Sequence, residues 1–114
     1  MEHGTFIIFG EDKNTLSRVK NTLTSNGYIY IGYSRQPINL LRHIRSCKPN
    51  FIVIEIGSNF KELKHIIEVI DEEILAACIF ILDSKNNEIN ELIRNTRILS
   101  YITKPVYDEV LLQI

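Results

Sequence analysis

Five short apolar runs, spaced regularly along the 114 residues, constrain the fold of this chain more than any other feature. Each run is about as long as one β-strand and is rich in β-branched residues, which favour strands. The runs are Thr5–Phe9, Tyr28–Tyr33, Phe51–Ile56, Ala77–Leu82 and Ile98–Thr103. Residues 51–54 are apolar at every position, as in strands that are covered on both faces of a parallel sheet. The pattern therefore predicts a buried five-stranded sheet.

Between these runs, apolar residues recur at helical spacing. They are Leu16, Val19 and Leu23 in the first segment, Ile38, Leu41 and Ile44 in the second, Leu63, Ile66 and Ile70 in the third, and Ile89, Leu92 and Ile93 in the fourth. Gly27 suits the C-terminal end of a helix, and a last helix is expected to begin near Tyr107. Strands alternating with helices indicate an α/β protein. Right-handed crossovers then favour a flavodoxin-like three-layer sandwich, with sheet order 2-1-3-4-5 and helices on both faces.

The composition fits a single domain that covers the whole chain. A net charge of −1 gives no long-range attraction to nucleic-acid phosphates or anionic lipid. No apolar run approaches the roughly 18 residues of a membrane span, and the start of the chain lacks a signal-peptide pattern, so we expect a cytoplasmic protein without a membrane partner. His3, His43 and His65 are scattered, and Cys47 and Cys78 have no CxxC spacing. We expect no metal or redox role for them, and two thiols that are buried or half-buried.

Charged residues follow several of the predicted strands. In α/β sheets of this kind, the functional crevice lies beyond the carboxyl ends of the strands. The residues expected there are Gly10, Glu11, Asp12, Glu55, Asp83, Ser84 and Lys104. Three strands thus deliver carboxylates to one edge and a fourth delivers an amine. Without further information, the acids could equally be solvated loop residues or helix N-caps, and the lysine a surface residue.

Four stretches of the sequence carry a further pattern: FIIFGEDKNTLSRVKNTLTSNGY, KPNFIVIEI, CIFILDS and SYITKPVYDEVL. In their order and separation they resemble the receiver domains of two-component response regulators, the CheY-like family. The first stretch is similar to the first strand, acidic loop and first helix of that family, and the second to the strand that ends in the phosphoacceptor. CIFILDS resembles the fourth strand. SYITKPVYDEVL resembles the strand end that carries the family's Lys-Pro pair, here Lys104-Pro105, and is the most specific of the four. The resemblance covers essentially the whole chain and implies the same flavodoxin-like fold.

The resemblance also implies roles, and several positions depart from the family. Glu55 takes the place of the phosphoacceptor Asp. The two acids that hold Mg²⁺ in the family correspond to Gly10 and Glu11, or to Glu11 and Asp12 if the alignment shifts by one residue. The Met-Pro and Asp-Gly elements usual after the phosphoacceptor are absent from residues 57–60.

The switch residues of the family fall on the last two strands. Asp83 takes the place of the hydroxyl residue that senses the phosphoryl group, although Ser84 supplies a hydroxyl if the alignment shifts. Tyr101 matches the switch aromatic, and an ordinary packing role against the fourth helix is the alternative. Lys104 and Pro105 match the family without change.

These departures act against ordinary aspartyl phosphorylation. Phosphoryl transfer to a carboxylate needs a divalent cation, a correctly placed nucleophile and a lysine. Glu55 is one methylene longer than Asp, and a positioning error near 1 Å can cost about a hundredfold in rate. Asp83 adds negative charge where the phosphoryl group would arrive. We therefore expect no cofactor, or only weakly bound Mg²⁺, and a site held in one state by an ion pair between Lys104 and Glu55.

The leading prediction is an atypical receiver domain, not an enzyme, that acts in signal transduction and transcription regulation through protein contacts. The family implies a histidine kinase upstream, and a homodimer of the longer protein through the face of the fourth helix, fifth strand and last helix. We expect the last helix to be truncated at Ile114 and an RNA- or DNA-binding output domain to follow. SNGYIYIGYS and YITKPVYDEVLLQI resemble receivers of the ANTAR antiterminator group.

Two alternatives stay open. One is a receiver that is still phosphorylated, on a non-standard acceptor. The other is a small flavin- or nucleotide-binding protein with the same fold. The second is disfavoured, because a phosphate cradle after the first strand needs free amides, whereas Gly10-Glu11-Asp12 presents negative charge there.

Overall fold

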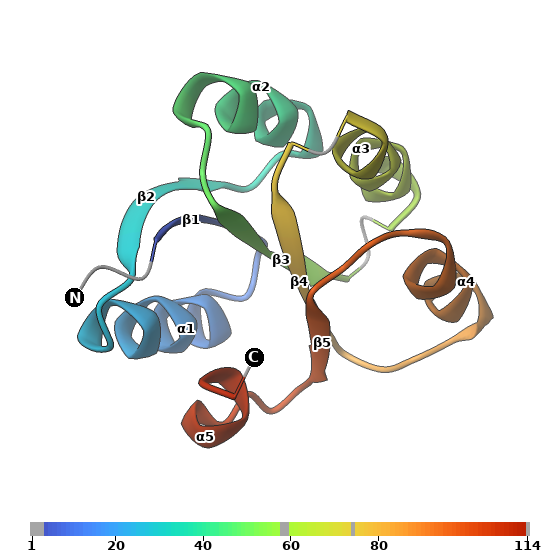
Figure 1. Ribbon diagram of the computed structural model, residues 1–114. Helices are drawn as coiled ribbons and strands as arrows, with labels where there is room; N and C mark the ends of the chain where they lie inside the picture. Colours follow the sequence, from blue (N-terminus) through green and yellow to red (C-terminus); the bar gives the residue numbers. More distant parts are fainter. Residues whose placement is uncertain (1–3, 58–59, 74, 114) are drawn as a thin grey trace.

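The computed structural model describes residues 4–57, 60–73 and 75–113 (Figure 1). Five strands form one sheet in the order β2-β1-β3-β4-β5, and every neighbouring pair is parallel. The strands are β1 (Thr5–Phe9), β2 (Ile29–Ser34), β3 (Phe51–Ile56), β4 (Ala77–Leu82) and β5 (Ser100–Thr103). The predicted sheet order is confirmed. The strand bounds agree to within one residue, except that β5 begins at Ser100 and not at Ile98.

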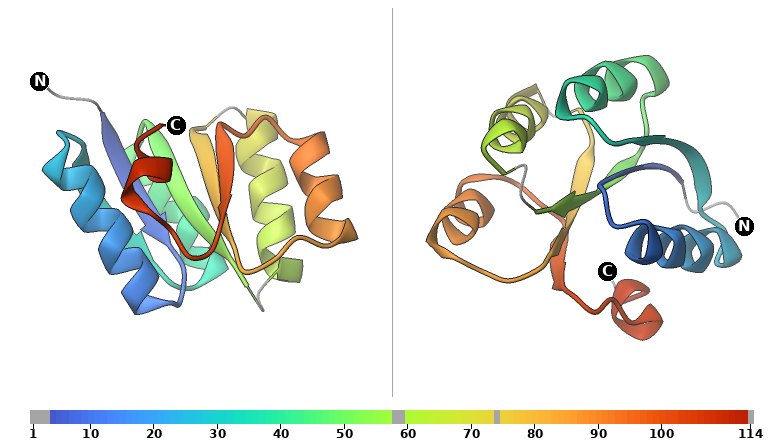
Figure 2. Two further views of the ribbon diagram at one scale, coloured as in Figure 1. Left: turned by 90° about the horizontal axis from the view of Figure 1, so that it is seen from below. Right: turned by 180° about the vertical axis from the view of Figure 1, so that it is seen from behind.

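In the described ranges, five helices cover the sheet. They are α1 (Lys13–Ser25), α2 (Pro37–Cys47), α3 (Phe60–Glu73), α4 (Asn87–Asn95) and α5 (Asp108–Leu111). Helices α1 and α5 lie on one face, and α2, α3 and α4 lie on the other (Figures 1 and 2). The chain turns out of α1 through the C-cap Asn26 and then Gly27, whose φ of 95° suits glycine. This is the three-layer flavodoxin-like sandwich that the sequence predicts.

Successive residues of the central strands point to opposite faces of the sheet. In β1, Phe6 and Ile8 pack toward α1 and α5, and Ile7 and Phe9 pack toward the other three helices. The same alternation in β3 places Glu55 on the side of α1 and α5. Among the described residues, Ser34 and Glu55 are the only polar side chains that belong to buried residues, each 6% exposed.

The predicted helix faces are correct in α1, α3 and α4 and partly wrong in α2. All three residues predicted for the apolar face of α1 are buried. In α2, Ile38 is 74% exposed and Leu40 lies in the core instead. The buried face of α2 follows from Pro37, Leu40 and Ile44, and Ile38 is one residue from Pro37, or about 100° around the helix. Three further residues predicted for core faces are half-buried: Leu41, Ile66 and Ile93.

The two cysteines differ in exposure. Cys78 in β4 is buried as expected, and burial, with a smaller effect of the Asp71 charge, raises the pKa of its thiol to about 12. Cys47 is exposed, so the expectation of a covered thiol is wrong there. It is the last residue of α2, where the helix ends at the left-handed Lys48. Within the described ranges, no helix is long and apolar enough to cross a membrane.

Candidate functional site

Four of the predicted charged residues meet at the carboxyl ends of the strands. The ammonium of Lys104, just after β5, lies at their centre. Its Nζ is 2.5 Å from Glu55 Oε2, 2.9 Å from Asp83 Oδ1 and 3.0 Å from Asp12 Oδ2. We call Lys104, Asp12, Glu55 and Asp83 the Lys104 cluster. The predicted pairing of Lys104 with Glu55 is confirmed.

Glu55 is the buried carboxylate of the cluster. Its Oε1 accepts hydrogen bonds from the backbone N–H groups of Glu11, at 2.7 Å, and of Asp12, at 3.0 Å. Its Oε2 has the Lys104 ammonium as its partner. Burying a carboxylate costs free energy unless the charge is paired and hydrogen-bonded. Glu55 meets both conditions, because Oε1 accepts two hydrogen bonds and Oε2 forms an ion pair with the Lys104 ammonium.

Gly10 lies directly against the Glu55 side chain. A Cβ at Gly10 would be 2.7 Å from both Cβ and Oε1 of Glu55 and 2.9 Å from Cδ1 of Leu16. The Gly10 backbone is held in this position, because its N–H donates to the carbonyl of Ser34 at 3.2 Å and its carbonyl accepts from the Tyr33 hydroxyl at 2.7 Å. Any side chain at this position would force the β1–α1 loop or its neighbours to move.

Asp12 uses both carboxylate oxygens. Oδ1 accepts the backbone N–H of Thr15 at 3.2 Å, which makes Asp12 the N-cap of α1. Oδ2 accepts from the Thr15 hydroxyl at 2.7 Å and from Lys104 at 3.0 Å. These hydrogen bonds, with the Thr15 side chain first, lower the pKa of Asp12 from 3.8 to about 2. Asp12 is therefore the N-cap of α1 and a partner of Lys104 at the same time, so the two predicted roles do not exclude each other.

Lys104 remains charged in this setting. Burial alone would lower the pKa of its ammonium, but hydrogen bonds to its three carboxylate partners outweigh burial and raise the pKa above the ordinary value. Its backbone N–H donates to the carbonyl of Leu82 at 2.8 Å, which continues the parallel pairing past the end of β5. The peptide bond from Lys104 to Pro105 is cis.

Other predicted residues stay outside the cluster. Glu11 is exposed, and its backbone N–H donates to Glu55 Oε1. An acidic pocket that includes the Glu11 carboxylate stays a prediction. Ser84 and Pro105 are exposed. Tyr101 is 36% exposed, with the ammonium of Lys85 4.2 Å from its ring centroid and in contact with its hydroxyl.

Sequence reasoning missed several groups that support the site. The contact with Thr15 had a signal in Asp12, because Asp is a preferred N-cap residue and its side chain accepts a backbone N–H two or three residues later. The contacts of Tyr33 and Ser34 with Gly10 had no signal in the sequence, because they depend on the pairing of β2 with β1. The hydroxyl oxygen of Ser34 also lies 3.0 Å from His43 Nδ1, and this hydrogen bond links β2 to α2. Ser58 and Asn59, in the loop expected to have its own shape, lie outside the described residues.

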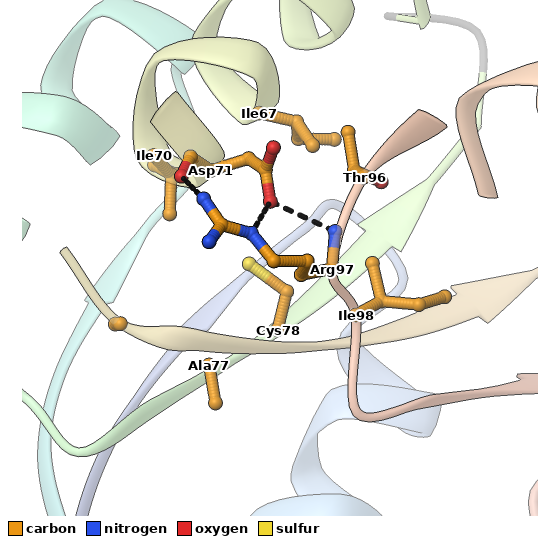
Figure 3. Close-up of a pocket in the computed structure, with 9 residues that line it drawn as sticks. Ile67, Ile70, Asp71, Ala77, Cys78, Thr96, Arg97 and Ile98 are labelled. Atoms are coloured by element: carbon orange, nitrogen blue, oxygen red, sulfur yellow. Dashed lines mark hydrogen bonds and ion pairs between the residues drawn. The ribbon is translucent and has the colours of Figure 1, made fainter. Parts of the chain in front are cut away.

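A cavity of about 280 Å³ opens near the amino-terminal ends of β4 and β5, away from the Lys104 cluster (Figure 3). It is lined by Ile67, Ile70, Asp71, Ala76, Ala77, Cys78, Thr96, Arg97 and Ile98. The Arg97 backbone N–H and Nε donate to Asp71 Oδ1 at 2.8 and 3.2 Å, and Nη2 donates to the Asp71 carbonyl at 2.6 Å. Its walls are mostly apolar and its two charged side chains are paired with each other. None of the predicted site residues lines it.

Comparison with known proteins rests on structure. No protein-family profile and no curated protein matches the sequence. The fold is similar to the CheY-like response regulator receiver domain protein from Methanospirillum hungatei JF-1, with a TM-score of 0.82 and 21% identity over 96% of this chain and 87% of that chain. A response regulator from Thermotoga maritima has a TM-score of 0.80 and 20% identity over 96% and 91%.

A third similar structure is the signal receiver domain of the modulated diguanylate cyclase from Desulfovibrio desulfuricans G20. Its TM-score is 0.82 at 17% identity, over 96% of this chain and 88% of that chain. At these identities the likeness establishes the fold and not the site. The architecture of this chain is therefore that of a response-regulator receiver domain.

Proposed function

We propose that this domain is a signalling module that works through protein contacts and is not switched by aspartyl phosphorylation. The observation that carries the proposal is the state of Glu55. One of its carboxylate oxygens binds two loop amides and the other binds the Lys104 ammonium. A carboxylate held on both sides is a poor nucleophile, because attack on phosphorus would require it to leave these partners.

The charges around Lys104 also disfavour a phosphoryl group. Phosphoryl transfer needs positive charge to stabilise the oxygens of the transferring group. Lys104 already faces three carboxylates, and Asp83 is one of them at 2.9 Å. An incoming phosphoryl group would compete with these carboxylates for one ammonium and would be repelled by them.

A fixed site implies a fixed signalling surface. A switch moves only when a ligand interacts differently with its two states. Lys104 joins the end of β5 to β3 and to the β1–α1 loop, and Lys85 holds Tyr101 on the adjoining surface. We infer that partner proteins bind the face of α4, β5 and α5 in a single conformation of that face. Dimerisation of a longer protein through this face, and an output domain that binds RNA or DNA, are the forms of transmission we propose.

The test uses phosphoryl donors and amide NMR spectra. Acetyl phosphate and beryllofluoride should leave the wild-type spectrum unchanged, and mass spectrometry should find no added phosphoryl group. Glu55→Asp restores the acceptor of the family but leaves Asp83 in place, so we expect weak phosphorylation, which should increase when Asp83→Thr is added. Glu62→Asp, a substitution of an exposed glutamate in α3, is the matched control and should behave as wild type.

Stoichiometric phosphorylation of the wild-type protein would instead establish a working receiver with an unusual acceptor. The flavin or nucleotide reading has less support, because the amides of Glu11 and Asp12, which would form a phosphate cradle, already bind Glu55. No catalytic activity is part of the proposal.

A further inference from the structure

The receiver architecture implies a divalent cation beside the β1–α1 loop, and the residues of this chain do not fit one. In the part of the chain that the structure describes, no group of three or more His, Cys, Asp or Glu side chains is arranged to hold a metal ion. In the alignment without a shift, the resemblance assigns the two metal acids to Gly10 and Glu11, so one acid is missing. A side chain at position 10 would collide with Glu55, with a Cβ only 2.7 Å from Oε1.

The carboxylate oxygens of Asp12 and Glu55 are already engaged. Both oxygens of Asp12 accept hydrogen bonds from Thr15, and Oδ2 also accepts one from Lys104. Both oxygens of Glu55 are bound as well. Mg²⁺ requires near-octahedral oxygen coordination at about 2.0–2.1 Å. To take Asp12 and Glu55 as ligands, Mg²⁺ would have to displace the ammonium and break the N-cap of α1.

We propose that the Lys104 ammonium is the permanent cation of this site, and that Gly10 and Glu55 form a matched pair that excludes a divalent metal. This inference deepens the proposed function and rests on it. Three carboxylate oxygens lie 2.5–3.0 Å from Nζ. Among the described residues, Lys104 is the only cationic side chain paired with any of these acids. One ammonium therefore carries the charge role that a metal ion would otherwise have.

The matched pair follows from the length of the Glu55 side chain. Its extra methylene, relative to Asp, lets Oε1 reach the amides of Glu11 and Asp12. These two hydrogen bonds hold the loop so close to β3 that only glycine fits at position 10. The glutamate thus requires the glycine, and the glycine gives the glutamate its binding place.

The first experiment exchanges the cation. Amide spectra recorded with Mn²⁺ should show no saturable broadening around residues 10–12 and 55 in the wild type, and Mg²⁺ should not change its melting temperature. Lys104→Ala leaves three carboxylates without a counter-ion. We expect this variant to bind Mn²⁺ at least about tenfold more tightly than the wild type, and its melting temperature to rise saturably with Mg²⁺.

Two variants control this experiment. Lys85→Ala removes a nearby exposed lysine outside the cluster and should leave metal binding as in the wild type. Glu55→Gln added to Lys104→Ala should abolish the gained binding. Saturable Mn²⁺ binding by the wild type, or no gain in Lys104→Ala, would overturn the inference. The wild-type titration decides the question even if a variant folds poorly.

The second experiment measures the coupling between Gly10 and Glu55. Gly10→Ala should raise the unfolding equilibrium constant by about tenfold or more in the wild type, because the new Cβ meets tightly packed atoms. In a Glu55→Asp background the loop is no longer held by Oε1, so the same change should cost clearly less. Equal costs would contradict the matched pair. Phosphoryl donors are absent from both experiments, so this inference can fail while the proposed function stands, and the reverse.

Discussion

Asp12 and Lys104 are 92 positions apart in the chain, and their side chains meet with 3.0 Å between Oδ2 and Nζ. The same carboxylate caps α1 through the backbone N–H and hydroxyl of Thr15. One side chain therefore ties the start of α1 to the end of β5. Its ionisation affects the helix and the cluster together.

The loss of stability at acid pH should reflect the titration of the Asp12 carboxyl group. Its pKa falls from 3.8 to about 2 on folding. A lowered folded-state pKa contributes stability that is present above the unfolded pKa and is lost as pH falls through the folded pKa. We expect the free energy of unfolding, measured with urea, to fall between about pH 4 and pH 2. Asp12→Asn keeps an N-cap but has no charge, and it should show a smaller fall; identical slopes would contradict this.

Removal of the Lys104 ammonium should be costly. Lys104→Ala strands three carboxylates, one of them buried, and we expect a loss of about 2–4 kcal/mol in urea unfolding at neutral pH. The raised pKa of Lys104 means that its contribution is complete below the unfolded value near 10.5 and is lost only at higher pH. Lys85→Ala, at an exposed position, should cost less than about 1 kcal/mol. Comparable losses in the two variants would show that the cluster adds little.

The sheet was predictable because its signal is local. Each strand is a short apolar run, and the alternation of strands with helices leaves few topologies. The helix faces were less certain, as Ile38 and Leu40 show, because the first turn of α2 has apolar residues at adjacent positions and only packing against the sheet selects between them.

The site was predictable at the level of which charges converge and not at the level of contacts. Asp12, Glu55, Asp83 and Lys104 follow different strands and meet as expected. The close approach of Gly10 to Glu55 was not foreseen, because it depends on the separation between a loop and a strand to within a few tenths of an ångström.

The two thiols should differ in reactivity. Cys47 is exposed, whereas Cys78 is buried with its pKa raised to about 12. Because the thiolate is the nucleophile, a disulfide reagent such as DTNB at neutral pH should modify one thiol per chain rapidly and the second only on unfolding. Cys47→Ser should remove the rapid phase. A rapid phase that persists in this variant would mean that Cys78 is accessible in the folded protein.

The contact between Lys85 and Tyr101 should be specific but weak. The ammonium lies 4.2 Å from the ring centroid on the surface of the molecule. Lys85→Ala should shift the NMR signals of the Tyr101 ring and change stability by less than about 1 kcal/mol. The matched control is Lys20→Ala, since Lys20 lies 4.4 Å from the ring centroid of Tyr30. It should shift the signals of Tyr30 and leave those of Tyr101 unchanged.

The close approach of Gly10 to Glu55 also has a consequence for the evolution of the sequence. If each residue is stable only beside the other, a lineage that carries both cannot regain an acid at position 10 by one substitution without a loss of stability. Nor does Glu55→Asp alone supply the missing acid. An acid at position 10 therefore has to follow a change at Glu55, so the pair constrains the order of the two substitutions. A receiver that has acquired it should persist in its altered form across divergent descendants, even where the surrounding surface changes freely.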